Sequence, residues 1–124
     1  MKVFYENYSL EKGISGENAL LTNEKFVLDL FYEFLDESLE LEQDSFLGII
    51  DENNTTLQFI ALEDKWLVEI PNPPSLINYQ MYVNYGEECI DLIKECFAFG
   101  KVKVFPDMVK VDIMNESLDD VLYK

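Results

Sequence analysis

Carboxylates are the reactive groups that this chain offers in number, because it contains 25 Asp and Glu residues and no histidine. The lack of histidine argues against nucleophilic triads, imidazole bases and most catalytic zinc sites. Two carboxyl groups that face each other across a cleft can act as acid and base, as in glycoside hydrolysis. With so many acids some pair always satisfies this pattern, so we do not expect an enzyme. A small acid-catalysed hydrolase or a metal-dependent enzyme is kept as a minor alternative.

Two short stretches partly resemble known metal and phosphate motifs. The stretch DENNTT begins like a calcium-binding EF-hand loop, with oxygen side chains at Asp51, Asn53 and Thr55. It departs from that loop at the sixth position, which is Thr56 instead of glycine, and at the twelfth, which is Leu62 instead of a bidentate Glu. The glycines of GISGEN lack the spacing of a P-loop or a dinucleotide fingerprint. We therefore expect no metal, no cofactor and no catalytic residue.

The acids are unevenly spread along the chain. Eleven acids and no basic residue stand between Lys25 and Lys65. At the helical period, four acids of the segment 23–40 fall within about 60° of one another, opposite its apolar side, and Glu37 flanks them. These four are Asp29, Glu33, Asp36 and Glu40. Like charges at i, i+4 spacing oppose a helix by roughly 0.2–0.5 kcal/mol per pair, so this acidic stripe is locally self-repelling.

A negative surface of this kind suits a basic protein partner. The formal net charge of −16 should repel nucleic acid and anionic membranes, so neither is expected to bind directly. A clustered negative field accelerates encounter with a basic partner. Tyr79, Tyr82 and Tyr85 follow the proline-rich stretch, and tyrosine is enriched among interface anchors. The alternatives are a stripe that serves only solubility and tyrosines that face the core.

The elements that must position these residues are indicated by hydrophobic periodicity. Helical spacing predicts one helix over 23–40 and a second over 87–99. The runs SFLGIID, TTLQFIAL and KWLVEIP predict an antiparallel meander, with Trp66 packed in the core. INYQMYVNY allows a fourth strand, and KVKVFPDMVKVDIM predicts a strand broken at Pro106. The sum is an α+β fold: an antiparallel sheet of about five strands with two main helices packed on it.

The remaining segments complete a single domain over residues 1–124. KVFYENY near the start predicts a short strand, SLEKGISGEN a loop, and residues 115–124 a short helix or a frayed tail.

Cys89 and Cys96 lie seven residues apart on the apolar side of the second helix, about 10 Å along its axis. They are therefore expected to be buried free thiols in a reducing compartment. With no signal-peptide core and no membrane span, we expect a cytoplasmic protein.

In size, acidity and order of elements the chain resembles small bacterial immunity proteins of contact-dependent growth inhibition and other polymorphic toxin systems. The resemblance is carried by the helix NEKFVLDLFYEFL, the Trp-led strand KWLVEIP at the end of a hairpin, the late helix EECIDLIKECF and a closing strand. It implies a non-enzymatic cytoplasmic protein that binds one cognate toxin domain, often a basic nuclease. Binding would block the active site of the toxin or a neighbouring surface.

Under this interpretation, the acidic stripe would pair with lysines and arginines of the toxin, and the tyrosines would supply desolvated anchors. The expected partner-binding residues are Asp29, Glu33, Asp36, Glu37, Glu40, Tyr79, Tyr82 and Tyr85. Two other classes stay open: a nucleic-acid mimic of the phage type, and an acidic structural or assembly protein. The sequence leaves the oligomeric state open.

Overall fold

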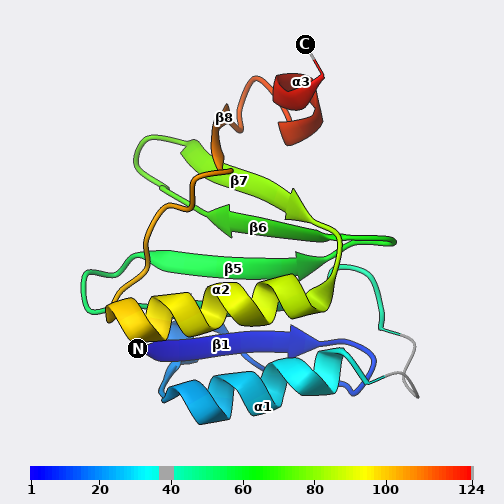
Figure 1. The fold of residues 1–124 in the computed structure, drawn as a ribbon, viewed down its shortest axis with the longest axis vertical. Helices are drawn as coiled ribbons and strands as arrows, with labels where there is room; N and C mark the ends of the chain where they lie inside the picture. Colours follow the sequence, from blue (N-terminus) through cyan, green and yellow to red (C-terminus); the bar gives the residue numbers. More distant parts are fainter. Residues whose placement is uncertain (37–40, 124) are drawn as a thin grey trace.

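An antiparallel sheet forms the base of the fold, and two helices cover one of its faces (Figure 1). The computed structural model describes residues 1–36 and 41–123. Its eight strands are β1 (Lys2–Asn7), β2 (Lys12–Ile14), β3 (Leu20–Leu21), β4 (Phe46–Ile50), β5 (Thr56–Ala61), β6 (Trp66–Ile70), β7 (Ile77–Val83) and β8 (Val109–Asp112). They follow the order β2-β1-β4-β5-β6-β7-β8, and β3 pairs with β1. The α+β class is confirmed, but the sheet is larger than the five strands expected.

The helices are α1 (Glu24–Phe34), α2 (Gly86–Phe99) and α3 (Leu118–Leu122), with a 3-10 turn at Gly16–Asn18. Figure 1 shows α1 and α2 side by side on the sheet and running in opposite directions, so α1 ends near the start of α2. The short helix α3 lies beside β8, away from this pair. The predicted second helix, the meander β4–β6, strand β7 and a short helix near the end of the chain are all confirmed.

Two strand predictions need correction. The segment predicted as a loop contains β2, whose pairing with β1 places Ile14 opposite Tyr5. Such a three-residue strand is set by its neighbour, because so short a run carries no periodicity of its own. The strand predicted around Pro106 is limited to β8, since a turn at Pro106 precedes it. Proline cannot donate a hydrogen bond to a ladder, which fits this late start.

The first helix is shorter than the segment 23–40. It begins as expected at Asn23, whose side chain accepts a hydrogen bond from the N–H of Phe26 at 2.9 Å. It ends at Phe34, and Leu35 caps it. The Leu35 side chain packs so closely on Gly86 that a Cβ atom there would collide with it. This contact between the two helices, and acids that oppose the dipole at a helix C-terminus, account for the early end.

Aromatic side chains fill the space between α1 and the sheet. The Phe31 ring lies 5.0 Å from the indole of Trp66 and 5.8 Å from the ring of Phe59, measured between ring centres. The prediction that Trp66 packs in the core is confirmed, because only 7% of it is exposed. Cys89 and Cys96 on α2 are also buried and free, as expected. Burial raises the pKa of both thiols above the usual range.

A buried carboxylate ties three strands together on the face of the sheet opposite the core. Glu69 of β6 accepts hydrogen bonds from Gln58 Nε2 at 2.5 Å, from Asn78 Nδ2 at 3.0 Å and from Gln80 Nε2. A buried charged group is costly unless it is well hydrogen-bonded, and these amides supply that compensation. A shift of one residue would move Glu69 to the other face, so the cluster also fixes the register of β5, β6 and β7.

Candidate functional site: an acidic groove where the helices meet

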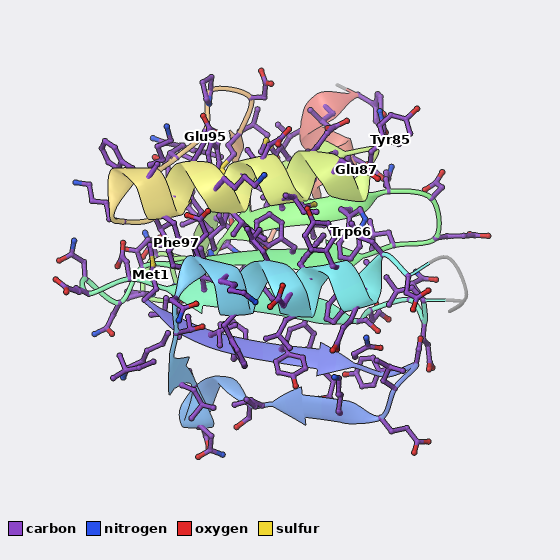
Figure 2. The ribbon with its side chains drawn as sticks, turned by 60° about the horizontal axis from the view of Figure 1, so that its bottom comes forward. Met1, Trp66, Tyr85, Glu87, Glu95 and Phe97 are labelled. Atoms are coloured by element: carbon purple, nitrogen blue, oxygen red, sulfur yellow. The ribbon has the colours of Figure 1, made fainter. Side chains whose placement is uncertain are left out.

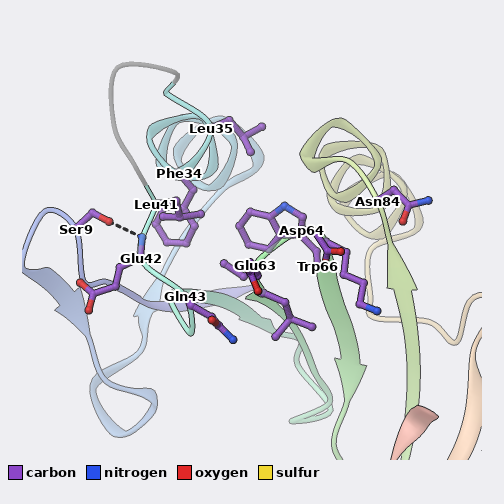
Figure 3. A pocket seen from close by; sticks show the side chains of 13 residues that line it. Ser9, Phe34, Leu35, Leu41, Glu42, Gln43, Glu63, Asp64, Trp66 and Asn84 are labelled. Carbon is purple, nitrogen blue, oxygen red and sulfur yellow. Dashed lines mark hydrogen bonds between the residues drawn. The ribbon is translucent and has the colours of Figure 1, made fainter.

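A groove of about 1010 Å³ opens at the end of the molecule where α1 ends and α2 begins (Figure 3). Five segments line it: Ser9 after β1, the end of α1, residues 41–43, residues 61–66 around the turn between β5 and β6, and Asn84 before α2. The hydroxyl of Ser9 accepts a hydrogen bond from the N–H of Glu42 at 2.7 Å, which ties residues 41–43 to the turn after β1.

The lining of the groove is mixed, and its apolar part forms the floor. This floor is formed by Phe34 and Leu35 at the end of α1, Leu41, and Trp66 at the start of β6. The rings of Phe34 and Trp66 are stacked, with centres 6.4 Å apart and planes inclined by 10°. Figure 3 places these two rings next to each other, with Leu41 close by. Trp66 is the one tryptophan of the chain.

The rim of the groove is acidic, with exposed side chains at Glu42, Glu63 and Asp64. Within the described part of the chain, no ion pair joins these three carboxylates to a lysine. Lys65, which also lines the groove, places its ammonium 3.9 Å from the centre of the Tyr82 ring. Tyr82 belongs to the face of the sheet opposite Trp66, so this cation is directed away from the floor of the groove.

A second group of acids follows the exposed side of α2, which begins beside the groove. Glu87, Asp91 and Glu95 are spaced four residues apart and share one side of the helix, as Figure 2 shows for Glu87 and Glu95. Glu95 lies 3.9 Å from Lys103, whereas Glu87, Glu88 and Asp91 have no ion pair within the residues described. Glu87 and Glu88 stand in the first turn, where the helix dipole favours acids.

The stripe predicted from the sequence does not form one helical row. Asp29 and Glu33 lie on α1 and are neighbours there, but Asp36 follows the end of the helix. Glu37 and Glu40, the other predicted members of the stripe, lie outside the described residues.

The two acids on α1 are also already paired with lysines. Asp29 contacts Lys25, one turn earlier, at 2.8 Å, and Glu33 contacts Lys12 of β2 at 2.5 Å. These hydrogen bonds raise the pKa of each lysine above its ordinary value. These two lysines reduce the self-repulsion expected for this part of the stripe. The cations come from the preceding turn and from a neighbouring strand.

The three predicted tyrosines do not form one surface. Tyr79 and Tyr82 point to opposite faces of β7, and Tyr79 packs against the core. Burial, and then a hydrogen bond to Asp119 of α3, raise the pKa of Tyr82 to about 12. Tyr85 is 66% exposed and immediately precedes α2, next to the groove. Of the three, Tyr85 is the most exposed.

The acids of the groove rim and of α2 were not among the partner-binding residues predicted from the sequence. For α2 a signal was present, because acids at positions 87, 91 and 95 share one side of a helix. The groove had no comparable signal. Its lining comes from separate segments that only the folded sheet brings together.

Within residues 1–36 and 41–123, no three acidic or cysteine side chains are grouped so that they could hold a metal ion. In the same residues, no helix has the length and apolar character needed to cross a membrane. Comparison with models of protein families, with curated proteins and with solved structures finds no match. What the chain binds is therefore inferred from its own charge and shape.

Proposed function

We propose that this chain is an immunity protein, which binds and neutralises a cognate basic toxin domain by covering its active site or an adjacent surface. A nuclease is the expected activity of that toxin. The observation that supports the proposal is the gathering of carboxylates without lysine partners at one end of the described structure. They border the groove and continue along the first turns of α2.

This arrangement suits binding by occlusion. Its negative field attracts a positively charged domain over a distance, which increases the rate of encounter. On contact, lysines and arginines of the toxin relieve the mutual repulsion of the carboxylates. The apolar floor of the groove supplies the desolvated centre in which interface energy concentrates. Neutralisation of this kind requires no catalytic group on the inhibitor.

A nucleic-acid mimic is the second candidate, and the row of acids on α2 favours it. Glu87, Asp91 and Glu95 advance by about 6 Å per step along the helix axis, which approximates the spacing of phosphates. Such a mimic would inhibit proteins that handle DNA or RNA. It would bind several unrelated proteins of this kind instead of one cognate toxin.

The proposal is tested by using the tagged chain to capture proteins from a lysate of the source organism, at low and at moderate salt. One basic protein retained in stoichiometric amount at both salt concentrations, and inactive while bound, is the expected result. Several unrelated nucleic-acid enzymes would favour the mimic. Only a mixture of basic proteins that is lost at moderate salt would contradict both candidates. A stable homo-oligomer whose acidic end stays free would instead indicate a structural or assembly protein.

A further inference from the structure

We propose that the groove between α1, α2 and the β5–β6 turn receives one arginine side chain of the bound partner. The guanidinium would lie among the carboxylates of the rim, and its methylene stem would lie against the apolar floor. This inference rests on the proposed function, because the arginine belongs to the toxin domain that the chain neutralises.

The shape of the groove supports an inserted side chain. Its volume of about 1010 Å³ is at the upper end of the roughly 300–1,000 Å³ typical of ligand pockets, so a side chain and part of its loop can enter. Leu41, which lies beside the two rings, offers aliphatic contact for a methylene stem. Phe34 and Trp66 are buried and stacked on each other, so this part of the floor is already packed before binding.

Charge complementarity selects the occupant. Glu42, Glu63 and Asp64 have no lysine partner within the described residues, and Lys65 is held by the ring of Tyr82. An anionic group would be repelled by this rim. A purely apolar side chain would desolvate the carboxylates without offering them a hydrogen bond. A cationic side chain with an apolar stem satisfies both the rim and the floor.

Arginine fits this site better than lysine. Its planar guanidinium carries five donors and can bind carboxylates through two parallel hydrogen bonds. The guanidinium is also more weakly hydrated than the compact ammonium of lysine, so it is more easily brought against an apolar floor. The several carboxylates of the rim match its donors, and the floor around the buried pair Phe34 and Trp66 gives its stem apolar contact.

The test uses the fluorescence of Trp66, the one tryptophan of the chain and part of the groove. The full chain is titrated with a blocked Gly-Arg-Gly peptide and with the matching citrulline peptide, which has nearly the same shape but no charge. The arginine peptide should change the emission of Trp66 with saturation. The citrulline peptide should bind about tenfold more weakly or not at all, because it lacks the charge-assisted hydrogen bonds.

Two variants localise the effect. The double substitution Glu63→Gln and Asp64→Asn removes two charges from the rim and should weaken the arginine peptide by about fivefold or more. Its matched control, Glu52→Gln with Asp107→Asn, removes the same charge from exposed turns outside the groove and should leave binding unchanged. All four residues are exposed, and the circular dichroism of both variants serves to establish that they fold.

Equal responses to the arginine and citrulline peptides would overturn the inference, as would equal weakening by the rim variant and its control. The outcomes for the groove and for the proposed function are distinguishable. A chain that captures a basic toxin but shows no preference for the arginine peptide would retain the function and lose the groove. Arginine-selective binding without any captured toxin would support the groove and contradict the immunity function.

Discussion

The ring of Phe34 stacks on the indole of Trp66, with ring centres 6.4 Å apart, and this contact joins the last turn of α1 to the start of β6. Both residues are nearly buried and also line the groove. Phe34→Ala should therefore lower the free energy of unfolding by about 3 kcal/mol, through lost burial and the cavity left beside Trp66. Urea denaturation followed by circular dichroism measures this loss.

The matched control is Phe26→Ala, because Phe26 lies on the same helix but is 45% exposed. Its substitution should change the free energy of unfolding by no more than about 0.5 kcal/mol. Equal losses in the two variants would show that the stacked pair has no special part in holding α1 to the sheet.

Acids that lack a lysine partner should contribute more to toxin binding than acids that already have one. Neutralising Glu87 and Asp91 together should weaken the complex by about tenfold, because both are free to contact the toxin. Neutralising Asp29 and Glu33 should weaken it by about threefold or less, since each would exchange one cation for another. Dissociation constants measured at one salt concentration compare the pairs. A larger loss of affinity on neutralising Asp29 and Glu33 than on neutralising Glu87 and Asp91 would instead support the stripe predicted from the sequence.

The carboxylate of Asp51 should be structural. Its Oδ1 accepts hydrogen bonds from the N–H groups of Asn53 and Thr55, and its Oδ2 accepts one from the N–H of Val102 at 3.0 Å. Asp51→Ala leaves these donors without their acceptor and should lower the free energy of unfolding by about 2–3 kcal/mol. Asp51→Asn keeps an acceptor oxygen and should lose about half as much. Thermal unfolding measures these losses, with Glu52→Ala at an exposed neighbouring position as the control. Equal stability of Asp51→Ala and Glu52→Ala would show that the Asp51 carboxylate has no structural role.

Tyr82 should make the stability of the protein fall at alkaline pH. Its pKa in the folded chain is about 12, whereas an unfolded tyrosine ionises near pH 10. Above pH 10 the unfolded chain loses this proton first, so the contribution of Tyr82 to stability is complete below pH 10 and declines as the pH approaches 12. Tyr82→Phe removes this part of the alkaline decline and leaves the part that comes from the buried thiols of Cys89 and Cys96. Tyr85→Phe, which changes an exposed side chain, should leave the decline as it is. Urea midpoints measured from pH 8 to pH 11 test the difference, and parallel curves for wild type and Tyr82→Phe would contradict it.

The elements that could be predicted from the sequence are those with a strong local period. The second helix and strands β4 to β7 each carry enough apolar residues to indicate both their type and their face. The end of α1 could not be located in this way. It depends on Leu35 packing against Gly86, which lies far along the chain. Strand β2 likewise exists because β1 offers it a partner.

The candidate site was harder to predict because it too depends on contacts between segments that are distant in the sequence. The groove combines the end of α1 with residues 41–43, the turn 62–65 and Asn84, so no window of sequence contains it. The pairing of Glu33 with Lys12 also crosses from α1 to β2. A stretch without basic residues in sequence therefore acquires cations in the folded chain. The acidity of the protein could be predicted, but not which acids remain without a lysine.

Neutralisation of a basic toxin domain is tested most directly by titrating the captured domain with the full chain while its enzymatic activity is measured. One-to-one occlusion predicts that activity falls in proportion to the added chain and is abolished at one equivalent. The variant with Glu87→Gln and Asp91→Asn should abolish the activity only when it is added in clear molar excess over the toxin domain. Full activity of the toxin domain at several equivalents of the wild-type chain would contradict the proposed function.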